Sequence, residues 1–294
     1  MKLIQTTLTG IGQIFLQENY FSGLLITIGM FFSHWALGVA CLLGSLIGTL
    51  TAQGLKFPEE QIQQGLYGFN ASLAMMCALF TFGEDDPSRL TVWLLGAVAA
   101  VVATLIMRVF MKAGRPAYTF PFVLTSWAFC WGVAHFGLFG LAQTTPPLAD
   151  YTDPINAAIE PLYAWAEVNF GSSLLTGLFL FTGIAISSPH AAMWGTAAAT
   201  FGTALAAWLF NIDGNSLANG LYGFSAVLVA CAFVGNRLLD LIYVVLGIAL
   251  AVIIQYAVAQ TGLSAYTFGF IAASWLVLFA KKYLERTALA SPRA

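Results

Sequence analysis

Two polar side chains at matching places in the two halves of the chain have the types and spacing to handle a small polar molecule. Gln13 precedes Gly23 by ten residues, Glu167 precedes Gly177 by ten, and each glycine lies at the start of an apolar stretch. An ionisable side chain in lipid costs about 3 kcal/mol, so Glu167 is expected to face a cavity or a partner. Taken alone, it could also be solvated at the headgroup level. Its pairing with Gln13 favours a role in a pore.

A second repeated motif supplies apolar side chains. GLYGFNASL contains Phe69 and Leu73, and GLYGFSAVL contains Phe224 and Leu228 at an offset of 155 residues. Because the chain has 24 phenylalanines, any one of them is more typically a core or lipid-facing residue. The repetition favours Phe69 and Phe224 as pore-lining residues. A pore with apolar walls excludes ions, because an ion would lose its hydration shell there without compensation.

The third repeated motif supplies hydroxyl groups. AYTFPF contains Thr119, and AYTFGF contains Thr267 at an offset of 148 residues. Threonine in an apolar helix commonly hydrogen-bonds a carbonyl one turn earlier, and this is the alternative interpretation of each residue alone. As a pair, the two hydroxyls are expected to offer hydrogen bonds near the membrane midplane.

The shared order and near-constant offsets of these motifs predict two tandem copies of one module. We predict a first repeat over 1–145, a linker over 146–161 and a second repeat over 162–294, which together form one membrane domain. The linker carries prolines, which discourage helix, and acidic residues without a basic one. These residues are Pro146, Pro147, Pro154, Asp150, Asp153 and Glu160. We expect a non-helical, acidic loop there.

The elements that must position these residues are apolar helices. The chain is 59% hydrophobic and 8% charged, which makes the lipid bilayer its expected environment. A helix needs about 20 mostly apolar residues to cross it, and about ten stretches qualify. They lie near residues 20–34, 36–54, 66–83, 90–112, 119–142, 172–188, 191–210, 219–236, 238–261 and 267–283. The sequence therefore predicts an all-α integral membrane protein.

The basic residues predict its orientation. With about ten crossings, both termini lie on one side, and every Lys and Arg except Arg89 falls on that side. Basic residues favour the cytoplasm, so both termini are expected to be cytoplasmic. With about five crossings per half, the second copy enters from the opposite face, which predicts inverted five-helix repeats.

Other function classes find little support. The four cysteines lack metal-ligand spacing, and no grouping of a nucleophile, a metal site or an acid/base pair points to an enzyme. No basic stripe suits nucleic acid. We therefore expect no metal, no cofactor and no catalytic residue.

Gln13, the two GLYGF segments, AYTFPF and Glu167 together resemble the bacterial urea transporter family, and the resemblance spans both halves. It implies a homotrimer in a bacterial inner membrane, with one pore per protomer and segments that cross only half the bilayer. It also implies roles for particular residues. Gln13 and Glu167 would lie at the pore mouths, Thr119 and Thr267 at the centre, and the remaining slot positions would be Leu16, Phe69, Leu73, Val168, Phe224 and Leu228.

The chain departs from the family pattern at several positions. Leu16 stands where an aromatic ring is usual, with Phe15 beside it as a substitute. Ala71 replaces a usual glycine, Ser225 replaces asparagine in the second copy, and Gly269 replaces the proline of the first copy. These departures leave the slot width and the range of permeants open.

Urea is flat, neutral and strongly hydrated, so its pore must replace lost hydrogen bonds, each worth several kcal/mol when left unmade. The threonine hydroxyls, the Gln13 and Glu167 side chains and unwound backbone carbonyls could accept its N–H groups. Passive, channel-like urea transport is the expected function. An ion-coupled secondary transporter, or a channel for short amides, ammonia or water, are the alternatives.

Overall fold

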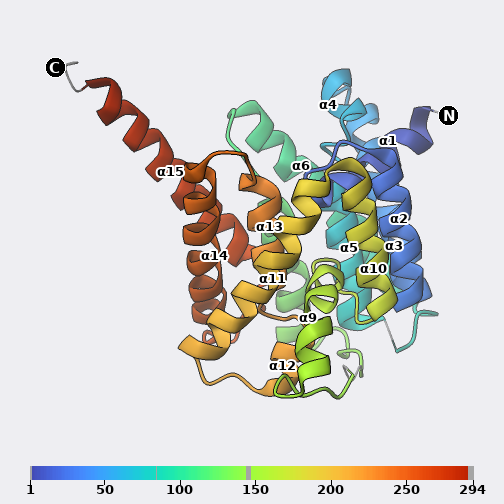
Figure 1. Cartoon of the computed structure of the whole chain (residues 1–294). Helices are drawn as coiled ribbons and strands as arrows, with labels where there is room; N and C mark the ends of the chain where they lie inside the picture. The colour runs from blue at the N-terminus through green and yellow to red at the C-terminus, as the bar shows by residue number, and fades with distance from the viewer. Residues whose placement is uncertain (1, 84, 144–146, 291–294) are drawn as a thin grey trace.

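The protein is described by a computed structural model over residues 2–83, 85–143 and 147–290, and the secondary structure of these residues is helical (Figure 1). The first half contains α1 (Lys2–Gly12), the 3₁₀ turn η1 (Gln13–Phe15), α2 (Tyr20–Ser33), α3 (Trp35–Gly54), α4 (Glu59–Gln63), α5 (Phe69–Phe82), α6 (Leu90–Lys112), α7 (Phe120–Ser126), the π-helical η2 (Trp127–Trp131) and α8 (Gly132–His135). The second half contains α9 (Pro154–Glu167), α10 (Leu174–Ser187), α11 (Pro189–Leu209), α12 (Gly214–Ala218), α13 (Phe224–Phe233), α14 (Leu238–Ala259) and α15 (Phe268–Ala290).

The second half repeats the helix order of the first. Helices α2 and α10 begin 154 residues apart, α5 and α13 begin 155 apart, and α6 and α14 begin 148 apart, which are the offsets of the motifs. Unusual backbone conformations repeat as well: left-handed φ angles occur at the equivalent residues Leu16 and Phe170 and at the equivalent residues Tyr118 and Tyr266. Residues other than glycine rarely adopt this backbone conformation. Its recurrence at equivalent positions therefore indicates that the same local structure is formed in both halves.

Reciprocal contacts join the halves along α2 and α10. Ser22 Oγ donates to the Gly183 carbonyl at 2.7 Å, and Thr176 Oγ1, 154 residues after Ser22, donates to the Gly29 carbonyl at 2.8 Å. Reciprocity of this kind is typical of a two-fold relation. The helices approach closely enough that a Cβ on Gly29 would lie 2.8 Å from a methyl carbon of Leu180.

Equivalent elements lie at opposite ends of the molecule. Figure 1 shows α4 at the same end as the start of α1 and the end of α15, whereas α12, the counterpart of α4, lies at the other end.

Within the described residues, three helices, α3, α6 and α14, are long and apolar enough to cross a membrane, and α2, α5, α10 and α13 are shorter apolar helices. On α6 the exposed side chains Leu94, Val98, Leu105 and Val109 form an apolar stripe suited to lipid. The all-α prediction is confirmed for the described residues, whereas the count of about ten spans stays a prediction. The expected span 119–142 is helical only to His135, where Gly137, with φ of 63°, begins a new backbone direction.

The expectation of a non-helical linker is wrong for 154–161. Helix α9 begins at Pro154, because proline is favoured in the first helical turn and Asp153 caps the helix by accepting from Ile155 N. Glu160, expected in an acidic loop, is instead fully buried in α9. The predicted boundary at 145–146 lies outside the described residues.

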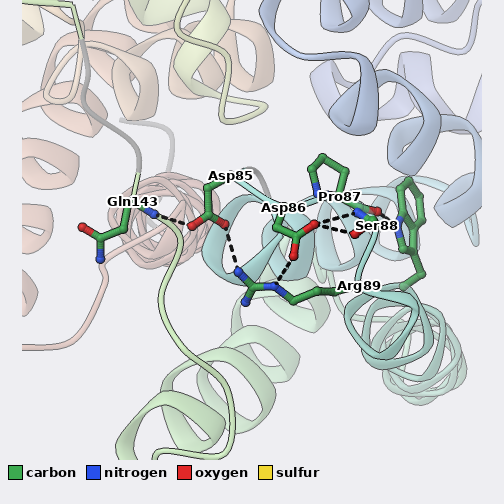
Figure 2. A network of polar contacts seen from close by, with 7 residues as sticks. Asp85, Asp86, Pro87, Ser88, Arg89 and Gln143 are labelled. Carbon is green, nitrogen blue, oxygen red and sulfur yellow. Dashed lines mark hydrogen bonds and ion pairs between the residues drawn. The ribbon is translucent and has the colours of Figure 1, made fainter.

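Arg89, the one basic residue predicted on the far side, sits in an acidic loop (Figure 2). Its guanidinium lies 3.0 Å from Asp86 and 3.5 Å from Asp85, and Asp85 also accepts from Gln143 N. Hydrogen bonds from Ser88 and then from Arg89 hold the pKa of Asp86 below its ordinary value. The loop between α5 and α6 is thereby tied to the loop that follows α8.

Candidate functional site

Two hydroxyls meet where the halves come together. Thr119 Oγ1 and Thr267 Oγ1 lie 2.7 Å apart, and each residue is 2% exposed. Each threonine immediately precedes a helix, α7 or α15, and follows a tyrosine with left-handed φ. The two equivalent turns therefore place one hydroxyl from each half at a shared point. The two hydroxyls bond to each other, whereas the alternative interpretation had each of them bonding to a carbonyl one turn earlier.

A cavity of about 310 Å³ opens beside this pair. Of the predicted site residues, Glu167, Val168, Phe224 and Thr267 line it. The rest of its lining is mostly aromatic and aliphatic, consisting of Phe80, Phe122, Phe170, Leu221, Tyr222, Gln255, Ala259, Ser264, Ala265 and Tyr266. The cavity thus has apolar walls with a few polar groups at Glu167, Thr267 and Gln255, a composition typical of sites for small molecules.

Four rings of this wall contact one another around Phe170. Its ring centroid lies 5.2 Å from that of Phe80, 6.0 Å from that of Phe122 and 6.3 Å from that of Tyr266. Phe122 and Tyr266 are 5.5 Å apart. Because the rings come from four separate segments of the chain, they fix the cavity wall as a unit.

The other predicted site residues do not line this cavity. Gln13 donates through Nε2 to the Gln64 carbonyl at 2.8 Å. Leu73 and Leu228 are fully buried, Phe69 is nearly so, and Leu16 occupies the left-handed position after η1. Thr119 reaches the cavity through its bond to Thr267. The cavity is therefore built chiefly by second-half residues, with Phe80 and Phe122 from the first half.

Sequence reasoning missed Phe170, Tyr266 and Gln255. The signal for Phe170 was present, because adding the offset of 154 residues to Leu16 leads to it. The ring that the first copy lacks at Leu16 is therefore present in the second copy. Phe15, the suggested substitute, packs instead against Trp165 with ring centroids 5.4 Å apart.

The buried Glu160 lies near the turn that precedes Phe224. Its Oε1 accepts from Thr203 Oγ1 at 2.7 Å, and a Cβ on Gly223 would lie 2.6 Å from the same oxygen. The side chain thus ties α9 to α11 and to the GLYGF turn of the second half. Glu160 therefore positions the turn before Phe224, which lines the cavity, against the buried helices α9 and α11.

Chemically, the site can replace water around a small neutral polar molecule. The threonine pair provides an O–H donor and acceptor lone pairs, and the Gln255 amide and the Glu167 carboxyl add further polar groups. The rings provide flat apolar walls. Such an arrangement binds by orientation and hydrogen bonds and requires no covalent step.

The chain matches one family of known proteins over most of its length. Residues 4–282 match the family described as urea transporter. Urea transporter 1 of Rattus norvegicus is 26% identical over 261 residues, covering 82% of this chain and 65% of that protein. Urea transporter 1 of Ovis aries is 27% identical over 307 residues, covering 95% of this chain and 77% of that protein. The chain therefore spans just under two thirds of the rat protein.

Proposed function

Because the chain belongs to the urea transporter family, whose members are multi-pass membrane proteins, we propose that it conducts urea passively across a membrane. The family membership supports urea as the permeant. The observation that carries the proposal is the Thr119–Thr267 hydroxyl pair, formed by one residue from each half and opening on an aromatic cavity.

In this mechanism urea sheds its water as it enters between the rings. The loss of its hydrogen bonds to water is compensated by the Glu167 carboxyl, the Gln255 amide and then the threonine hydroxyls, so the barrier stays low. An ion finds no comparable replacement for its shell between apolar walls and is excluded. Each contact is a single hydrogen bond to a neutral or singly charged group, so urea can be released on the other side.

The proposed architecture is a pair of inverted five-helix repeats over 1–145 and 162–294, with half-membrane segments that meet at the threonines. The opposite placement of α4 and α12 and the reciprocal α2–α10 bonds support this arrangement. Gln13 and Glu167 are proposed to lie at the two mouths, with Leu16, Phe69, Leu73, Val168, Phe224 and Leu228 along the slot. We further propose a homotrimer with one pore per protomer, in a bacterial inner membrane with cytoplasmic termini.

Stopped-flow light scattering of proteoliposomes tests the proposed function. Vesicles that hold the protein should reswell in an inward urea gradient at least tenfold faster than protein-free vesicles, roughly the effect of removing a barrier of 1.4 kcal/mol or more. The rate should be unchanged when ionophores collapse sodium and proton gradients. Flux that vanishes with those gradients would instead indicate an ion-coupled transporter.

A further inference from the structure

At two pairs of equivalent positions, the two halves carry their amide side chain on different helices. Gln255 on α14 corresponds to Met107 on α6, since these helices begin 148 residues apart. Ser225 on α13 corresponds to Asn70 on α5, since those helices begin 155 residues apart. The first half thus has an amide on α5 and a thioether on α6. The second half has a hydroxyl on α13 and an amide on α14.

In the first half, Asn70 organises the turn that carries Thr119. Its Oδ1 accepts from Phe122 N at 2.9 Å, and its Nδ2 donates to the Tyr118 carbonyl at 3.1 Å. The same Nδ2 lies 3.8 Å from the sulfur of Met107. Asn70 is fully buried, so its amide serves the protein interior.

In the second half, the amide comes from the neighbouring helix. Ser225 Oγ donates to Gln255 Oε1 at 2.7 Å, and Gln255 Nε2 donates to the Leu221 carbonyl. Leu221 lies in the turn before Phe224, and both residues line the cavity. The exchange therefore moves the amide from the position of Asn70 to the wall of the cavity, where Gln255 is 5% exposed.

Gly269 packs closely against α14. A Cβ at Gly269 would lie 2.5 Å from the Ala251 carbonyl oxygen and 3.0 Å from Gln255 Cβ. The first copy has Pro121 at the equivalent position. Of the two second-copy departures from the family pattern, Ser225 bonds directly to Gln255, whereas Gly269 is required chiefly by the Ala251 carbonyl beside it.

We propose that Gln255 is a specificity-determining residue of the urea path. The inference rests on the proposed function. The bond from Ser225 uses one of the two lone pairs on Oε1, and the bond to Leu221 uses one of the two hydrogens on Nε2. A permeant that carries both N–H groups and a carbonyl matches the remaining lone pair and hydrogen. Methionine, the first-half residue, offers no donor and only a weakly accepting sulfur.

Urea and N-methylurea permeabilities of proteoliposomes test this proposal in Gln255→Met and in Ser225→Asn/Gln255→Met. Both substitutions keep the side-chain volume of residue 255 nearly constant. Gln255→Met should lower urea permeability about tenfold, because the hydrogen bonds to Ser225, to Leu221 and to the permeant are lost. The urea to N-methylurea ratio should fall about threefold, since N-methylurea has already lost one N–H. Gln260→Met, an exposed change just after α14, is the matched control.

The double variant separates specificity from packing. It copies the first-half pair, so its thermal unfolding midpoint should return to the wild-type value while its permeability ratio stays low. A double variant with the wild-type ratio, or a Gln255→Met variant that conducts urea as the wild type does, overturns the proposal. Wild-type vesicles that pass no urea would instead sink the proposed function, and this shows before any substitution is compared.

Discussion

At the scale of single residues, the proposed permeation path depends on the two threonine hydroxyls. Thr119 and Thr267 bond to each other at 2.7 Å, so removing one hydroxyl leaves the other without its partner in a buried place. A buried hydroxyl left unpaired costs about 1–3 kcal/mol, and the same group is lost to the permeant.

Thr119→Val should therefore lower urea permeability roughly tenfold, as measured by stopped-flow reswelling. Thr119→Ser, which keeps the hydroxyl, should stay within about threefold of the wild type. A valine variant that conducts at the wild-type rate would show that the hydroxyl pair is structural only.

Part of this site could be predicted from the sequence. The paired positions of Thr119 and Thr267 and the cavity-lining Glu167, Val168 and Phe224 followed from repeated motifs and from the family resemblance. That the hydroxyls bond to each other did not follow, because their contact depends on how the two halves dock. Gln255 was not found either, since no motif repeats at its position and its partner Ser225 looked like a simple loss of asparagine.

At the scale of elements, the close approach of α2 and α10 holds the halves together. Gly29 permits it, because a Cβ there would lie 2.8 Å from Leu180 and 2.9 Å from Phe179 Cβ. Small residues at such crossings allow van der Waals contact and hydrogen bonds between helix backbones in lipid.

Gly29→Leu should therefore destabilise the protein by about 1–3 kcal/mol through overpacking, seen as a lower midpoint of thermal unfolding in detergent. Gly54→Leu is the matched control, because nothing lies within 4 Å of a Cβ at that position. Equal midpoints for the two variants would contradict the role given to the α2–α10 contact.

Helix α9 shows why local signals misled. The prolines in 146–161 predicted a non-helical segment. Pro154, however, occupies the first turn of α9, where its missing N–H has no cost. Pro161 lies inside the helix and Glu160 is buried beside it, so tertiary contacts, such as the bond from Thr203, add to the local start signals at Asp153 and Pro154. Composition alone could not reveal those contacts.

At the scale of the whole molecule, the duplication was readable from motif offsets, whereas the cavity was not, since its lining comes unequally from the halves. The central claim is that the two halves enter the membrane from opposite sides and meet at the threonines. It requires α4 and α12 to face different compartments, as their placement at opposite ends suggests (Figure 1).

The most direct test is labelling of single added cysteines with a membrane-impermeant maleimide, applied to intact and to opened cells. Gln63→Cys in α4 and Asn211→Cys just before α12 place exposed thiols, and the four native cysteines are buried, which keeps the background low. We predict that Asn211→Cys is labelled in intact cells and that Gln63→Cys reacts only after the cells are opened. Labelling of both positions from the same side would contradict it.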